Sequence, residues 1–128
     1  MAQDRESGAR ADSWGRNKSK DIARALNATA LSSNSNECTV SERRIVIKCA
    51  RGGNNKIGVP YKMLPRIASV IAAFERLDGA FDLIEISSDA FRQAMGPTRS
   101  TGRSSGKVGM VHRGYFEAHA EWRTIIRA

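Results

Sequence analysis

Long apolar runs and closely spaced cysteine pairs are both missing from this chain of 128 residues. No stretch comes near the roughly 18 consecutive apolar residues that span a bilayer, which argues against a membrane-spanning helix. Residues 1–10 are too polar for a secretory signal peptide. The two cysteines, Cys38 and Cys49, lack CxxC spacing, so we expect reduced thiols that pack as small apolar groups. These absences predict a cytoplasmic protein with no membrane partner.

Acidic residues are scarce relative to basic ones. The chain has 21 Lys and Arg residues against 13 Asp and Glu, which leaves a formal net charge of +8. Such an excess is the electrostatic footprint of proteins that meet phosphate groups, although it also fits a charge that only maintains solubility. We favour contact with a polyanion.

Aliphatic residues are almost absent from the N-terminal segment. Residues 1–17 are charged and contain Ser and Gly, so they bury too little surface to offset the entropy of ordering, and we expect a disordered tail there. Residues 18–128 then form one domain around one hydrophobic core. Ser19 is a suitable N-cap for a short helix over residues 20–27, and residues 31–36 are an expected polar loop.

A β-branched run, Ile45 to Ile47, marks the most clearly buried strand. Such a run is typical of a strand covered on both faces, so we expect a central strand over residues 44–50. Residues 51–55, Arg-Gly-Gly-Asn-Asn, form a turn whose glycines allow a phosphate to approach the backbone closely.

The pair Asp78-Gly79 between two apolar segments is the strongest hairpin signal in the chain. Residues 66–74 match both a helical face and a strand, and the hairpin signal favours the strand. Residues 81–86 form the expected return strand. Two antiparallel strands are therefore predicted here.

The C-terminal third is predicted to alternate between helix, loop and strand. Ser88 is a suitable cap for a short helix that ends at Met95, before Gly-Pro. Residues 98–107 form a basic, polar loop, residues 108–112 a last strand, and residues 115–127 a final helix. Together these elements predict an α/β (α+β) fold, with a central mixed β-sheet that contains a hairpin and is flanked by helices.

Glu37 is followed by the strand that ends with Lys48, then by a basic loop, a hairpin and a helix. This order and spacing resemble those of the restriction-endonuclease-like, or PD-(D/E)XK, nuclease superfamily. The resemblance covers residues 18–122. It implies that Asp21 matches the family's acidic residue on the first helix, Glu37 its motif Asp, and Lys48 its lysine. In such sites carboxylates bind a divalent cation and the lysine stabilises charge or orients the attacking water. Glu37 would thus be a ligand of Mg²⁺, and Asp21, Glu37 and Lys48 the catalytic residues.

Val46 occupies the strand position at which the family carries Asp or Glu. Residues two apart on a strand share a face, so Val46 and Lys48 point to the same side. Glu42 and Glu85 are the candidates to replace the missing carboxylate. The resemblance therefore implies a nuclease-like scaffold in which catalysis is reduced or lost, with an active Mg²⁺-dependent endonuclease as the alternative.

Nucleic-acid binding, with duplex DNA as the expected partner, is the function that these features favour. Phosphate contacts position a protein on the duplex without reading its bases. A non-enzymatic adaptor or inhibitor that docks on an acidic protein is a further alternative, and a homodimer is the default assembly. The basic residues expected to contact phosphates are Arg43, Arg44, Arg51, Lys56, Arg99, Arg103 and Lys107.

Overall fold

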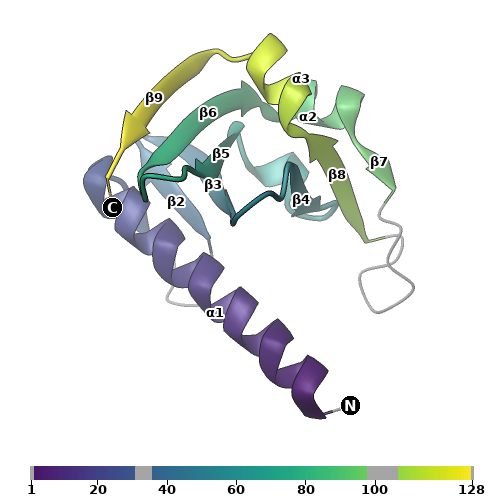
Figure 1. The fold of residues 1–128 in the computed structure, drawn as a ribbon. Coiled ribbons are helices and arrows are strands. Elements are labelled where there is room, and N and C mark those ends of the chain that lie inside the picture. Colours follow the sequence, from purple (N-terminus) through teal and green to yellow (C-terminus); the bar gives the residue numbers. More distant parts are fainter. Residues whose placement is uncertain (1, 31–35, 98–106, 128) are drawn as a thin grey trace.

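A computed structural model describes residues 2–30, 36–97 and 107–127. In these ranges the chain forms a mixed α/β fold, with a six-stranded sheet in the order β1-β2-β3-β5-β6-β9 and a three-stranded sheet in the order β4-β8-β7 (Figure 1). The strands are β1 (Thr29–Ala30), β2 (Glu37–Val40), β3 (Arg43–Ala50), β4 (Lys56–Pro60), β5 (Ser69–Glu75), β6 (Phe81–Ser87), β7 (Gly96–Pro97), β8 (Val108–His112) and β9 (Trp122–Ile126). The helices are α1 (Ala2–Ala25), the 3₁₀ helix η1 (Leu64–Arg66), α2 (Ser88–Ala94) and α3 (Arg113–Ala118).

Strand β3 is the central buried strand that the sequence predicts. It pairs antiparallel with β2 and parallel with β5. Ile45, Val46 and Ile47 are each 0% exposed, as expected for consecutive residues that point to opposite, equally covered faces. The predicted fold class, a mixed sheet with a hairpin and flanking helices, is therefore confirmed.

Strands β5 and β6 form the predicted antiparallel hairpin. Gly79 has a φ of 84°, which a glycine adopts without steric cost. Asp78 Oδ1 accepts a hydrogen bond from the backbone N–H of Ala80 at 3.0 Å, which holds the turn. The local turn chemistry thus decides between the two periodicities that residues 66–74 carry.

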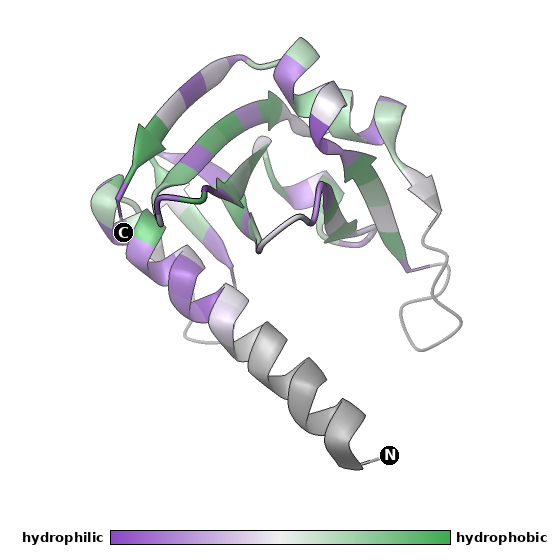
Figure 2. Ribbon diagram, viewed as in Figure 1, coloured by the Kyte–Doolittle hydropathy of each residue, from purple (hydrophilic) through white to green (hydrophobic). Residues whose placement is uncertain are grey.

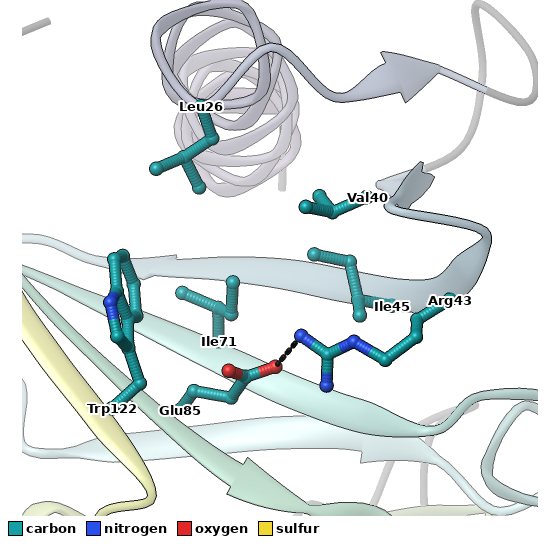
Figure 3. A pocket seen from close by; sticks show the side chains of 7 residues that line it. All are labelled: Leu26, Val40, Arg43, Ile45, Ile71, Glu85 and Trp122. Atoms are coloured by element: carbon teal, nitrogen blue, oxygen red, sulfur yellow. Dashed lines mark hydrogen bonds and ion pairs between the residues drawn. The ribbon is translucent and has the colours of Figure 1, made fainter.

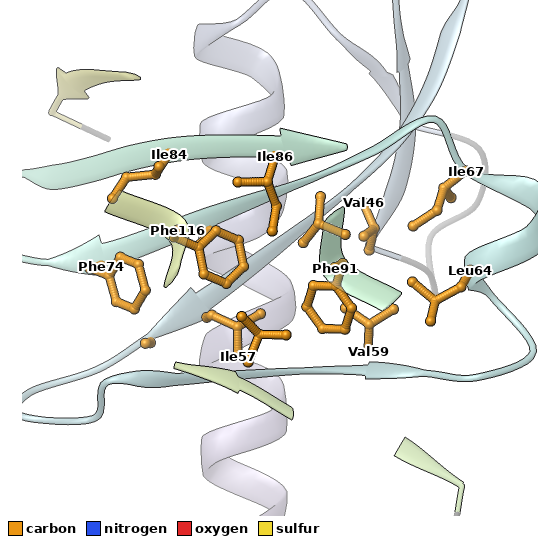
Figure 4. Packing of buried hydrophobic residues seen from close by; sticks show 14 residues of the cluster. Val46, Ile57, Val59, Leu64, Ile67, Phe74, Ile84, Ile86, Phe91 and Phe116 are labelled. Carbon is orange, nitrogen blue, oxygen red and sulfur yellow. The ribbon is translucent and has the colours of Figure 1, made fainter. Parts of the chain in front are cut away.

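The two faces of the six-stranded sheet have separate hydrophobic cores. On one, which we call the helix face, Ile22 of α1 packs with Ile45, Ile47 and Ile71. On the other, the second-sheet face, β4, β8, α2 and α3 cover the sheet. The core residues labelled in Figure 4 include Val46, Ile57, Val59, Phe74, Ile84, Ile86, Phe91 and Phe116. Val111 belongs to the same core. Hydrophobic residues accordingly concentrate on the strands (Figure 2).

Helix α1 starts earlier than the sequence predicts. The backbone is helical from Ala2, across the segment expected to be a disordered tail. Ser19 is therefore not an N-cap: it lies inside the helix, is 3% exposed, and its Oγ donates to the carbonyl of Ile47 at 3.0 Å. The low apolar content of this segment led to the expectation of a disordered tail. A helix whose last turns are held by packing can nevertheless extend towards the N-terminus, because adding a turn to an existing helix costs less than starting a new one.

The prediction of a final helix over residues 115–127 is wrong. Helix α3 ends at Ala118, and Trp122–Ile126 form strand β9, which pairs antiparallel with β6. The strand contains the β-branched residues Thr124, Ile125 and Ile126, which favour an extended backbone. Pairing with β6, the second strand of the hairpin, therefore outweighs the helical spacing of the aromatic and aliphatic residues in this segment.

The short helix after β6 and the strand over residues 108–112 agree with the prediction to within a residue. Strand β8 matches the expected strand, and Ser87 rather than Ser88 caps α2, accepting a hydrogen bond from the N–H of Ala90. Residues 31–35 and 98–106, with most of the two predicted polar loops, are not described. None of the described helices is both long and apolar enough to cross a membrane.

Candidate nucleic-acid interface

A buried carboxylate joins two arginines at the start of β2 and β3. Glu37 is 3% exposed, and its carboxylate accepts from Arg44 Nη2 at 2.9 Å and from Arg66 Nε at 2.7 Å. Both guanidinium groups are nearly half exposed, at 44% and 45% of their side chains. We refer to these three residues as the Glu37 cluster. Two positive charges and one negative charge leave it with a net charge of +1.

The arginines determine the protonation of Glu37. Burial acts to raise the pKa of its carboxyl, but the hydrogen bonds and charges of Arg44 and Arg66 outweigh burial and bring the pKa below its ordinary value. Glu37 is therefore ionised at neutral pH and holds both guanidinium groups in place.

The sheet topology explains why Arg66 reaches Glu37. Arg66 ends η1, just before β5, and β5 runs parallel to β3. The N-terminal ends of β3 and β5 are therefore neighbours, and the N–H of Ala68 donates to the carbonyl of Arg44 at 2.7 Å. Only a parallel pairing brings the segment before β5 beside the beginning of β3.

The structure places Glu37 and Lys48 on one face and Asp21 across the other. Glu37 is the cross-strand partner of Val46, and Lys48 lies two residues after Val46, so both belong to the second-sheet face. Asp21 lies on α1, which covers the helix face, and pairs with Arg24 at 4.0 Å. The three residues predicted as catalytic are thus not brought together.

Neither candidate supplies the missing carboxylate beside Lys48. Glu85 pairs with Ile71 across β5 and β6, and therefore belongs to the helix face. Glu42 is exposed in the turn between β2 and β3. Within the described ranges, no group of three or more His, Cys, Asp or Glu side chains could hold a metal ion.

Consecutive arginines at the start of β3 serve opposite faces of the sheet. Arg44 binds Glu37 on the second-sheet face, whereas Arg43 Nη2 lies 3.3 Å from Glu85 Oε2 on the helix face. Ser69 Oγ also donates to Glu85 Oε2. Two buried carboxylates thus orient two neighbouring guanidinium groups in opposite directions.

The other predicted phosphate contacts are spread over both ends of the fold. At the far end of β3, the guanidinium of Arg51 lies 5.1 Å from the ring centroid of Trp14 in a cation–π contact. Lys56 is exposed at the start of β4. Lys107 lies at the other end of β4, where its carbonyl accepts from the N–H of Tyr61 at 2.9 Å. Arg99 and Arg103 lie outside the described residues.

Sequence reasoning missed Arg66, which completes the Glu37 cluster, and also Ser69 and Trp122. Arg66 stands in a Pro-Arg dipeptide that carries no recognisable motif. Its only usable signal is its position directly before a strand, and that signal becomes informative only once β5 is known to run parallel to β3.

No family model matches this chain, and no match exists among the curated proteins or the solved structures with which it was compared. The resemblance to the PD-(D/E)XK superfamily therefore stays a prediction from the residues alone.

Proposed function

We propose that this protein binds nucleic acid through phosphate contacts centred on the Glu37 cluster. The observation that carries the proposal is that one buried carboxylate fixes two half-exposed guanidinium groups. Arg44 uses Nη2 and Arg66 uses Nε for this purpose. The other guanidinium N–H groups of the two arginines have no hydrogen-bond partner among the described residues and are available to an anion.

Arginine held in this way is well suited to phosphate. Its planar fork matches phosphate oxygens with two parallel hydrogen bonds, and a fork that is already oriented loses less side-chain entropy on binding. The net charge of +8 for the whole chain adds a long-range attraction for polyanions. Lys48, on the same face, adds a further positive charge.

The same geometry favours the binding of an anion to the arginines of the Glu37 cluster over the binding of a divalent cation to Glu37 itself. Both of its oxygens already accept hydrogen bonds from arginine, and two guanidinium charges lie beside it. A metal ion would have to displace these bonds and meet two positive charges. Binding that does not require Mg²⁺, on a scaffold without nuclease activity, is therefore the form of the function that we propose.

Fluorescence anisotropy with a labelled duplex DNA tests this proposal. The double variant Arg44→Ala/Arg66→Ala should bind about tenfold more weakly or worse, and the slope of log affinity against log salt should fall by about two. The control is Arg76→Ala/Arg127→Ala. It removes the same charge from two arginines that share one carboxylate, Asp78, on the β5–β6 hairpin.

Equal losses in the two double variants would show that only net charge matters and would overturn the cluster as the interface. Circular dichroism and thermal melts confirm that each variant is folded. Running the titration once with EDTA and once with Mg²⁺ distinguishes binding that needs no metal from Mg²⁺-dependent nuclease activity. Mg²⁺-dependent strand cleavage that Glu37→Ala and Lys48→Ala both abolish would replace the proposed binding role by nuclease activity.

A further inference from the structure

A pocket of about 290 Å³ opens on the helix face, between the end of α1 and strand β9 (Figure 3). That volume is near the lower end of the range for small-molecule sites and suits a ligand of a few rings. Five of its side chains are apolar or aromatic, and the remaining two are an ion pair. The lining residues are Leu26, Val40, Arg43, Ile45, Ile71, Glu85 and Trp122.

Glu85 presents an unused acceptor to this pocket. Its side chain is only 7% exposed, and its Oε2 accepts from Arg43 and from Ser69. Its Oε1 has no hydrogen-bond partner among the described residues. Figure 3 shows this oxygen on the side of Trp122, away from the bond to Arg43. A carboxylate oxygen that Arg43 and Ser69 leave unused can accept a charge-assisted hydrogen bond from a ligand N–H.

The pocket also selects against charged ligands. Arg43 and Glu85 neutralise each other, so neither an anion nor a cation gains a net Coulomb attraction there. A suitable ligand offers an N–H to Glu85 Oε1 and a carbonyl or ring nitrogen to the remaining donors of Arg43, whose side chain is 50% exposed. It also has flat apolar faces to lie against the indole of Trp122.

We propose that this pocket binds an unpaired nucleobase. The edge of a base carries adjacent N–H donors and acceptors, and its face stacks on aromatic side chains. The inference rests on the proposed function for the choice of ligand, and it names the substrate class: nucleic acid with unpaired bases. Because Arg43 and Arg44 are consecutive, base capture on one face and phosphate contact on the other occur at the same end of β3.

Nucleosides test the pocket without involving phosphate contacts. In a Trp14→Phe background, Trp122 is the only remaining tryptophan, so its fluorescence reports on the pocket alone. Uridine should quench it in a saturable manner that is insensitive to salt. 3-Methyluridine, which lacks the base N–H, should bind about tenfold more weakly, because Oε1 then stays unpaired.

Two variants and a control assign the effect. Glu85→Gln should abolish the discrimination between the two nucleosides, because Arg43 retains the amide oxygen and the pocket then faces an NH₂ donor. Trp122→Leu, measured by equilibrium dialysis, should weaken uridine binding while leaving the pair of Arg43 and Glu85 intact. The control, Ile125→Ala, changes a residue that is 53% exposed on the same strand but on the opposite face, and should bind normally.

Failure of the pocket and failure of the interface give different results. If no nucleoside quenches Trp122, or if 3-methyluridine binds as well as uridine, the pocket inference is overturned, whereas the loss of DNA affinity in Arg44→Ala/Arg66→Ala can still stand. If uridine binds as expected but that double variant binds DNA normally, the interface proposal fails and the pocket inference survives. A single-stranded oligonucleotide should also protect Trp122 from quenching by iodide, and a duplex of the same sequence should not. That difference would support the binding of unpaired bases in the pocket.

Discussion

Arg66 Nε lies 2.7 Å from Glu37 Oε1, although the two residues are 29 positions apart and belong to different elements. The contact links the end of η1 to the first residue of β2 across the beginning of β3. It places three charged side chains, with Arg44, around one buried point.

Glu37→Gln should lower the free energy of unfolding by about 1–3 kcal/mol, because the amide loses the charge-assisted hydrogen bonds to Arg44 and Arg66. Urea denaturation monitored by circular dichroism measures the change. Glu42→Gln, at an exposed turn position, is the matched control and should unfold like the parent protein. Identical stabilities for both variants would mean that the buried carboxylate contributes nothing net.

The stabilisation from Glu37 should depend on pH in the acid range. Its pKa in the folded protein lies below the ordinary value of 4.5, despite burial, because of the two arginines. A group of this kind contributes fully above its unfolded pKa, and the contribution is lost as the pH falls through the folded pKa. The difference in unfolding free energy between the parent and Glu37→Gln should therefore shrink below pH 4.5. A difference that stays constant into strong acid would exclude an ionised Glu37.

Both cysteines should react slowly with thiol reagents at neutral pH. Burial raises the pKa of Cys38 to about 11, and burial also raises that of Cys49 to about 11, against the opposing effects of Ser19 and nearby lysines. Thiolates are therefore scarce at neutral pH, and the thiolate is the reactive form. A colorimetric thiol assay should detect fast reaction only after guanidinium is added. Prompt labelling of the native protein would contradict this burial.

Gly109→Ala should destabilise the small sheet by about 1–3 kcal/mol, because a methyl group there overpacks a filled site. A Cβ on Gly109 would lie 2.6 Å from Met95 Sδ, 3.0 Å from Met95 Cβ and 3.1 Å from a ring carbon of Tyr61. Gly53→Ala is the control, since nothing lies within 4 Å of its Cβ position. Thermal melts compare the two, and a Gly109→Ala protein as stable as Gly53→Ala would refute the tight packing between β8 and Met95.

Local chemistry predicted those parts of the fold that depend on neighbours in sequence. The β-branched run at Ile45 to Ile47 identified β3, and the turn at Asp78-Gly79 identified the hairpin. The segment after Ala118 failed for the opposite reason. Its apolar residues do follow a helical period, but pairing with β6 makes the segment a strand. The paired residues Ile84 and Arg123 are far apart in the sequence, so no local pattern reveals the pairing.

The candidate site was predicted only in part. Glu37 was singled out through the family resemblance, and Arg44 was singled out as a basic residue expected to contact phosphate. That they bind each other, and that Arg66 joins them, depends on the antiparallel register of β2 and β3 and on the parallel register of β3 and β5. Asp21 was paired with Glu37 on the strength of a family resemblance, and the sheet lies between them.

By itself, therefore, the sequence determined the class of fold, the central strand, the hairpin and the excess of positive charge, because these follow from composition and from contacts between near neighbours. Tertiary structure alone decided which charges meet. Side chains at successive positions such as Arg43 and Arg44 point to opposite faces of a strand, and which carboxylate each one finds depends on the strands that pair beside it. Strand pairing is a long-range choice, made by the packing of the whole sheet and not by the residues next to it.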